Sequence, residues 1–222
     1  MENKVSATIE DYLGVIYVLE RDNEPIHGVR LAALLGVSAP TVTNTLKRMV
    51  RDGLLEMNSE TGTHLTAHGM EQAKILMRRH MLAEWMLSKM LSWSKLHKEA
   101  HSMEHAISQE VEATLIDDLN QPELCPHGNP LPGFEAVVEN WLPLTRCAVG
   151  DRITIRRVHE LAEEERDVLA FLEANHIEPG ELVTVEEVLP FNQTITLKVG
   201  EKRVTLGDAL ARYIFGELAS QK

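Results

Sequence analysis

The residues best suited to chemistry in this sequence are the histidines and glutamates gathered between His97 and His105. On an α-helix, positions 97, 101, 104 and 105 project within an arc of about 100°, so three imidazoles and one carboxylate share a face. Imidazole nitrogen and carboxylate oxygen together suit divalent Mn, Fe, Co, Ni and Zn. The spacing therefore predicts a metal site built on a helix.

His80 and Glu84 form a second pair, at i and i+4, on the preceding predicted helix. Taken alone, this would be an ordinary surface pair, and a lone His97 would be a partly buried helix residue. Two histidines at i and i+4, like His101 and His105, also occur on helices without metal. Because the whole set spans two adjacent helices, metal binding is the favoured interpretation.

An HxxxH helix is also found in metallohydrolases, which need an open coordination position and a general base. The zincin pattern would be HExxH, whereas Ser102 follows His101 here. An enzyme is therefore not expected. Cys125 and Cys147 are too few for a disulfide framework and lack CxxC pairing, which fits a reducing compartment.

The first 75 residues are predicted to form a DNA-binding module. Apolar residues at helical spacing predict a first helix from Ile9 to Tyr17, with Thr8 and Asp11 as its capping box. A short helix over 29–35 and another opened by Ser38 form a helix-turn-helix pattern. Two short strands, over 53–57 and 63–66, predict a β-wing. A small helical domain without DNA contacts is the alternative.

The charge distribution is compatible with this module, although the net charge is −12. Residues 1–80 hold nine Lys and Arg against ten Asp and Glu, so most of the acid lies in the remainder of the chain. Lys47, Arg48 and Arg51 fall close together, as a DNA-facing helix requires.

Beyond the module, two longer helical stretches over 68–120 are split near residues 92–94, and Pro and Gly over 121–147 predict a tether. The first stretch has more apolar surface than an isolated helix should expose, which predicts a subunit interface. β-prone runs from residue 148, with a helix over 163–175, predict a small β-barrel. The expected fold is mainly α, with domains at 1–75 (winged helix-turn-helix), 76–142 (dimerisation and metal binding) and 148–222 (SH3-like).

Several motifs resemble the diphtheria toxin repressor and manganese transport regulator family of metal-dependent repressors, over nearly the whole chain. They are Glu10-Asp11-Tyr12-Leu13, Ser38-Ala39-Pro40-Thr41-Val42-Thr43, Arg79-His80-Met81-Leu82-Ala83-Glu84, His97 to His105, and Gly128-Asn129-Pro130-Leu131-Pro132-Gly133. The resemblance implies a homodimer that binds a palindromic operator when loaded with metal, and controls genes of metal homeostasis.

The resemblance also implies two metal sites per subunit. The regulatory site would use Asp11, His101, Glu104 and His105. The ancillary site would use His80, Glu84 and His97, with Glu165 from the C-terminal domain and Glu164 or Asp167 as nearby substitutes.

The combination of Asp11 and His101 matches neither branch of the family. The iron branch has methionine and cysteine where this chain has Asp11 and His101, and the manganese branch has aspartate and glutamate. The manganese branch also has a glutamate in place of Gly14, and the iron branch a glutamine in place of Val168. Because hard and borderline donors replace the thioether and thiolate, Mn(II) is favoured slightly over Fe(II).

The expected DNA contacts lie on the second helix of the helix-turn-helix. They are Ser38, Ala39, Pro40, Thr41, Thr43 and Asn44 near bases and phosphates, and Lys47, Arg48 and Arg51 on the backbone.

Two other classes of protein stay open at this point. One is a winged-helix regulator that responds to an organic ligand, and the other is a metal-handling or hydrolytic protein without a DNA target. The sequence contains no signal peptide and no membrane span, so we expect a cytoplasmic protein without membrane partners or organic cofactor.

Overall fold

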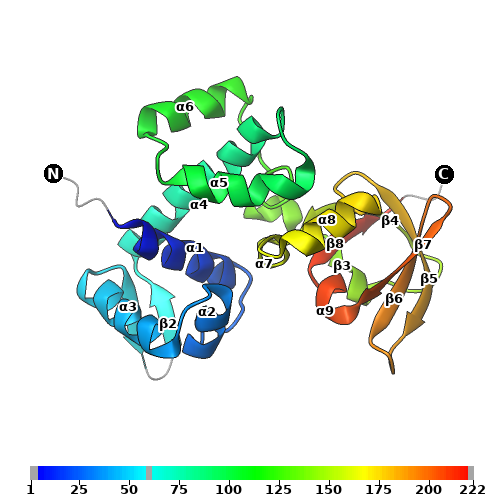
Figure 1. Cartoon of the computed structure of the whole chain (residues 1–222), viewed down its shortest axis with the longest axis horizontal. Helices are drawn as coiled ribbons and strands as arrows, with labels where there is room; N and C mark the ends of the chain where they lie inside the picture. Colours follow the sequence, from blue (N-terminus) through cyan, green and yellow to red (C-terminus); the bar gives the residue numbers. More distant parts are fainter. Residues whose placement is uncertain (1–4, 59–61, 220–222) are drawn as a thin grey trace. The chain divides into compact units, whose positions relative to one another are not determined.

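The computed structural model describes residues 5–58 and 62–219. The chain forms two compact units, the first from residues 1–79 and 104–107 and the second from residues 80–103 and 108–222 (Figure 1). Helices α4 (Ala67–Leu87) and α5 (Leu96–Glu104) contribute residues to both units. No helix within the described ranges is both long and apolar enough to cross a membrane.

The first unit is a winged helix-turn-helix, as the sequence predicts. In chain order it contains α1 (Ala7–Arg21), α2 (Gly28–Leu34), α3 (Ala39–Arg51), β1 (Leu55–Asn58), β2 (Gly62–Leu65) and the first part of α4. The two strands pair antiparallel, with Leu55 opposite Leu65. The tip of the predicted wing, residues 59–61, lies outside the described residues.

The N-cap predicted for α3 is confirmed, whereas the capping box predicted for α1 is not. Ser38 is the N-cap of α3, and its Oγ accepts a hydrogen bond from the Thr41 amide (3.3 Å). The predicted capping box of α1 is wrong, because that helix is capped at Ser6 without a side-chain hydrogen bond. Thr8 and Asp11 therefore lie inside the helix, which frees the Asp11 carboxylate from a capping role.

The helical part of the second unit follows the predicted break. After α4, the 3-10 helix η1 (Trp93–Lys95) leads into α5, and α6 (Gln109–Asp118) follows. Met81 and Leu82 are buried within the chain, so much of the apolar surface of α4 is internal rather than available to a partner. Met90 remains exposed.

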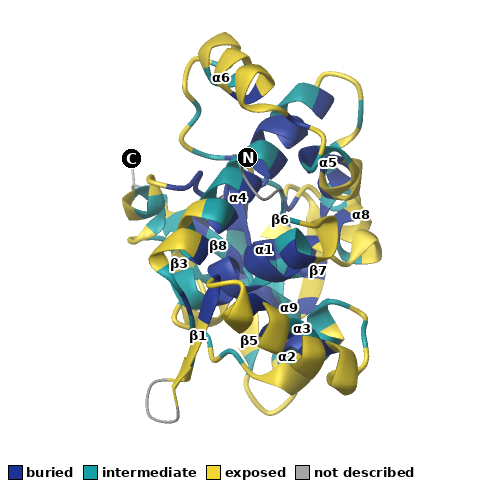
Figure 2. Cartoon of the chain, turned by 90° about the vertical axis from the view of Figure 1, so that its left-hand side faces the viewer, coloured by how far each residue is buried: buried dark blue, intermediate teal, exposed yellow. Residues whose placement is uncertain are grey.

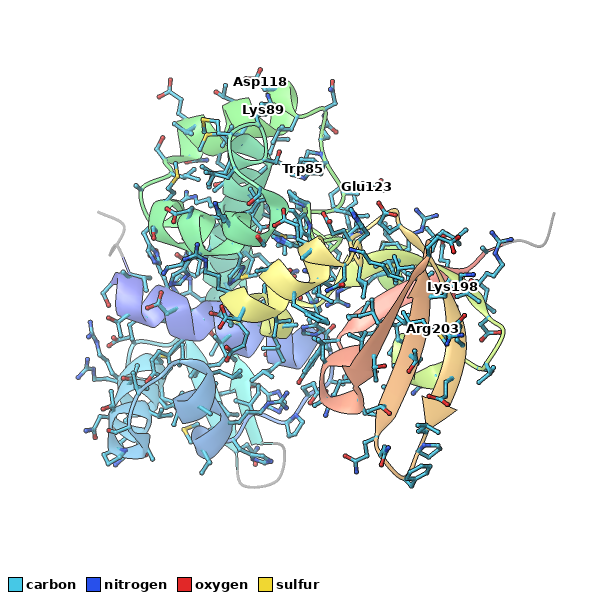
Figure 3. The ribbon with its side chains drawn as sticks, turned by 45° about the vertical axis from the view of Figure 1, so that its right-hand side comes forward. Trp85, Lys89, Asp118, Glu123, Lys198 and Arg203 are labelled. Carbon is cyan, nitrogen blue, oxygen red and sulfur yellow. The ribbon has the colours of Figure 1, made fainter. Side chains whose placement is uncertain are left out.

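The first residues of the tether are hydrogen-bonded to the C-terminal part of α4. The Trp85 indole Nε1 donates a hydrogen bond to the Leu124 carbonyl (2.7 Å), next to Glu123 (Figure 3). The turn η2 (Glu135–Val138) then leads towards the C-terminal domain.

The C-terminal domain is the predicted SH3-like domain, called the barrel below, and its six-stranded antiparallel sheet has the order β3-β8-β4-β5-β6-β7. Its apolar core also takes in side chains from α8, which lies alongside the strands (Figure 1). The elements are β3 (Leu142–Pro143), η3 (Leu144–Arg146), β4 (Arg152–Val158), α7 (Glu160–Glu163), α8 (Arg166–Ala174), β5 (Leu182–Leu189), β6 (Thr194–Val199), β7 (Lys202–Gly207), α9 (Asp208–Ala211) and β8 (Ile214–Leu218).

Two details of this domain differ from the sequence prediction. The helix expected over 163–175 corresponds to α8, whereas Glu163 ends the separate short helix α7, and the elements β3, α9 and β8 were not anticipated. Strand β8 contains Gly216, where a Cβ would lie 2.3 Å from Ile153 Cγ2 and 2.6 Å from the Thr154 carbonyl oxygen. The glycine therefore lets β8 pair closely with β4, although it weakens the strand signal.

Candidate metal centre

Four side chains of the second unit converge on one buried point. His80 and Glu84 lie one turn apart on α4, His97 comes from α5, and Glu163 is the last residue of α7. All four are buried. His80 Nε2 lies 3.0 Å from His97 Nδ1, and His97 Nδ1 lies 2.9 Å from Glu163 Oε2. We call these four residues the histidine–carboxylate cluster.

The tether adds two donors that the sequence analysis did not select. His127 is fully buried, with Nδ1 3.1 Å from Glu84 Oε1, and its ring packs on Trp93 with centroids 4.6 Å apart. Cys125 is also buried and forms a second potential donor group with Glu84 and His127. The Cys-Pro-His spacing next to Gly128 was the available signal. The count and spacing of the two cysteines exclude a disulfide framework, but they do not test Cys125 as a single metal donor.

The charges of this centre depend strongly on one another. Burial opposes ionisation of Glu84, but the facing His127, His80 and His97 hold the pKa of its carboxyl well below the usual range. Burial likewise disfavours the charged form of His97, yet Glu163, Glu164 and Glu84 raise its pKa well above the usual value. Protons on the imidazoles thus balance the carboxylates, as a divalent cation would.

Burial also disfavours the charged form of Cys125, and here the neighbouring charges do not oppose it. Together with the negative charge of Glu84 and Glu163, burial raises the pKa of the thiol well above its ordinary value. The thiol is therefore protonated at neutral pH, and it becomes a strong donor only when a cation displaces that proton.

The donors fit a divalent metal ion. Both Glu84 oxygens are buried and, among the described residues, neither accepts a hydrogen bond of good geometry. Three imidazole nitrogens nevertheless lie 3.1, 3.3 and 3.6 Å from Glu84 Oε1. Donors bound about 2.1 Å from one ion lie roughly 3 Å or more apart, so these separations suit a common cation. A buried carboxylate faced by imidazoles at such distances is a metal-ligand arrangement.

Glu163, and not the expected Glu165, lies in the histidine–carboxylate cluster. Glu165 is the exposed N-cap of α8, because the chain turns between α7 and α8 instead of continuing as one helix. Glu164 Oε1 does approach His97 Nε2, at 3.4 Å, whereas Asp167 is exposed in the first turn of α8. Val168 packs against the barrel core.

A second set of donors belongs to the first unit. His105 Nε2 lies 3.4 Å from Asp11 Oδ1 and 3.6 Å from Glu104 Oε1. His105 Nδ1 contacts Glu10 Oε2 at 2.7 Å, a partner that the sequence analysis did not select. The fourth expected donor, His101, is exposed on α5 one turn before Glu104, in the part of that helix assigned to the second unit.

The expected DNA contacts share one exposed face of α3. The opposite face of the helix is buried (Figure 2) and consists of Val42, Leu46 and Met49. The exposed residues are Ser38, Ala39, Pro40, Thr41, Thr43, Asn44, Lys47, Arg48 and Arg51.

Two of the cations on this face share an acidic neighbour. Arg48 and Arg51 approach Asp52 at 3.5 and 3.1 Å, so part of their charge is balanced locally. The remaining face is small, polar and accessible, as contact with a DNA groove requires.

Comparison with known protein families accounts for nearly the whole chain. Residues 4–63 match the iron dependent repressor N-terminal DNA binding domain, and residues 66–133 match the iron dependent repressor metal binding and dimerisation domain. The chain belongs to the iron-dependent repressor family. Residues 142–218 of this repressor match the FeoA domain, which corresponds to the barrel.

Individual relatives extend over most of this repressor. It is 34% identical to the iron-dependent repressor IdeR of Mycobacterium leprae, over 96% of this chain and 97% of that protein. It is also 34% identical to the diphtheria toxin repressor of Corynebacterium diphtheriae, over 93% and 95%. The solved structure of the manganese regulator SloR superposes with a TM-score of 0.80 at 27% identity, over 95% and 98%. The repressor is thus a metal-dependent transcriptional repressor related to regulators named for iron and for manganese.

Proposed function

We propose that this repressor acts as a homodimer that binds a palindromic operator through α3 when a divalent metal ion is bound. The exposed polar face of α3, backed by buried Val42, Leu46 and Met49, supports its role as the recognition helix. A dimer would present two such helices to successive major-groove faces of one operator. The family match to a dimerisation domain over residues 66–133 supports the oligomeric state.

The regulatory metal site in this proposal consists of Asp11, His101, Glu104 and His105. The approach of His105 to both Asp11 and Glu104 within the first unit supports three of these ligands. His101 stands one helical turn before His105 in the sequence, so it is the natural fourth donor. Since Asp11 belongs to α1 of the DNA-binding module, a metal held here would order that helix and favour the DNA-competent arrangement.

The ancillary site in this proposal is the histidine–carboxylate cluster, with His127 as a further nitrogen donor. The observation that carries it is the buried Glu84 carboxylate, which three imidazole nitrogens approach without hydrogen-bond geometry. Glu163 belongs to the barrel domain and Glu84 to α4, so a shared ion would join these two parts of the second unit.

The metal that we favour at the regulatory site is Mn(II), slightly ahead of Fe(II). Its proposed ligands are two carboxylates and two imidazoles, and none of them is a thiolate or thioether. Zinc, cobalt or nickel would still bind more tightly in a test tube, following the Irving–Williams order. The named relatives include both an iron-dependent repressor and a manganese regulator.

The experiment that tests this proposal measures transcripts of metal-homeostasis genes in cells starved of one metal at a time. We expect derepression of these genes when manganese is removed and iron is replete. In a strain that carries His105→Ala, the transcripts should already be high and should not rise further, because repression is lost. Derepression on iron starvation alone would reverse the choice of metal. Transcripts that respond to no metal would contradict metal-dependent repression itself.

A further inference from the structure

Asn129, in the tether, lies at the centre of a buried hydrogen-bond network in the second unit. Its side chain is fully buried. Nδ2 donates to the Val158 carbonyl (2.8 Å) and to Glu163 Oε1 (2.5 Å), while Oδ1 accepts from Arg157 Nε (2.5 Å). In each of these contacts a donor faces an acceptor: the NH2 group of the amide faces two oxygens, and its carbonyl oxygen faces an N–H of Arg157.

These partners leave only one orientation for the amide. Both acceptors face Nδ2 and the guanidinium donor faces Oδ1, so a flip of the amide would break all three hydrogen bonds. Arg157 is itself fixed, because its Nη2 donates a hydrogen bond to Glu160 Oε2 (3.1 Å) and its guanidinium lies 5.1 Å from the centre of the Phe215 ring. The Asn129 donor group is therefore held in place from the barrel side.

The backbone around Asn129 is also seated on the barrel. The His127 carbonyl accepts a hydrogen bond from the Val158 amide (2.8 Å). At Gly128 the φ angle is +86°, and a Cβ there would lie 1.9 Å from the Arg156 carbonyl oxygen. Only glycine permits this close approach, which brings the side chains on either side of it towards the metal centre.

The consequence for Glu163 follows from its two oxygens. Oε1 is occupied by the Asn129 amide, and Oε2 faces His97 Nδ1 at 2.9 Å. We infer that Asn129 is a positioning residue of the ancillary metal site, which holds Glu163 so that Oε2 is presented to the ion. This inference rests on the proposed function, and it makes metal affinity depend on the seating of the tether on the barrel.

A metal titration of the full-length chain tests the inference. His105→Ala serves as the parent, because it disables the proposed regulatory site and leaves the ancillary one. Mn(II) alone is the probe, and free Mn(II) is followed by its electron paramagnetic resonance signal. We expect Asn129→Ala to weaken Mn(II) binding by about tenfold or more, the usual effect of removing a partner that orients a metal ligand. Asn192→Ala, in an exposed turn of the barrel, should leave the affinity unchanged.

A double-mutant cycle separates positioning from a general structural role. If Asn129 acts through Glu163, then Asn129→Ala should cause no further loss of affinity in a Glu163→Ala background. Asn129→Asp is the second variant, because it keeps the shape and the acceptor for Arg157 but loses both donors, and it should also weaken binding. Thermal unfolding without metal confirms that each variant is folded.

The outcomes distinguish this inference from the proposed function. Unchanged affinity in Asn129→Ala and Asn129→Asp, or equal losses with and without Glu163, would overturn the positioning role alone. If the His105→Ala parent fails to bind Mn(II), the ancillary site is refuted and the inference falls with it.

Discussion

Glu10 Oε2 lies 2.7 Å from Nδ1 of His105, while Nε2 of the same ring faces Asp11 and Glu104. One imidazole nitrogen is thus held by a carboxylate, and the other points towards the proposed regulatory ligands. A carboxylate that accepts the second ring N–H of a metal-binding histidine fixes the ring and increases its basicity.

Glu10→Gln tests this relationship. Because an amide is a weaker acceptor than a carboxylate, we expect the Mn(II) concentration needed for half-maximal DNA binding to rise about tenfold. Fluorescence anisotropy of labelled operator DNA at constant salt measures this. Glu24→Gln, in the loop after α1, is the matched control, since Glu24 pairs with Arg30 instead. Equal metal requirements in the two variants would show that Glu10 does not support His105.

The two metal sites should differ in their effect on DNA binding. His105→Ala removes a ligand of the proposed regulatory site, so it should abolish metal-dependent binding. His80→Ala removes a ligand of the ancillary site and should weaken binding less. An operator titration with both variants at one Mn(II) concentration ranks them, and the reverse order would exchange the roles of the sites.

The fold could be predicted from the sequence in considerable detail, because its helices and turns depend on local signals. Ser38 as the N-cap and the break near Trp93 are examples that periodicity and capping preferences reveal. Strand β8 was missed since Gly216 interrupts its pattern, and that glycine makes sense only beside β4.

The donor sets depend on contacts that sequence spacing cannot define. His80, Glu84 and His97 were selected by helical periodicity. Glu163 was missed because a short turn between α7 and α8 changes which glutamate faces the cluster. His127 lies in a tether without periodicity, so only its packing against Trp93 and Glu84 reveals it.

Metal-free protein should be less stable at alkaline pH. Although burial alone would lower them, neighbouring carboxylates raise the pKa values of His97 and His127 above the ordinary 6.5. Their contribution to stability is complete below pH 6.5 and is lost as the pH rises through the raised values. The lowered pKa of Glu84 acts in the other direction, so its contribution is present above 4.5 and is lost as the pH falls through the lowered value.

Urea unfolding in excess chelator, followed by tryptophan fluorescence, measures this dependence. We expect the urea concentration at the unfolding midpoint to decrease as the pH is raised from 6.5 to 9. The decrease should be smaller in His127→Phe, which lacks one of the titrating rings. A midpoint that rises steadily over that range would contradict the charge balance described for the cluster.

Gly216→Ala should destabilise the barrel. The added Cβ would meet both a side chain and a carbonyl of β4, and overpacking of this kind costs about 1–3 kcal/mol. Gly207→Ala is the matched control, since a Cβ there meets nothing closer than the Gln193 carbonyl oxygen at 4.0 Å. The free energy of unfolding of each variant, from urea titration, checks the expectation. Equal stability of the two variants would mean that β8 can shift to accommodate the methyl group.

An electrophoretic mobility shift with one palindromic operator shows whether a divalent metal switches DNA binding by this repressor. The wild-type protein is titrated at fixed salt, once with Mn(II) and once with excess chelator, because phosphate contacts make any affinity salt-dependent. We expect a shifted dimer complex with Mn(II) and none at the same protein concentration with chelator. Equal affinity under the two conditions would contradict this expectation.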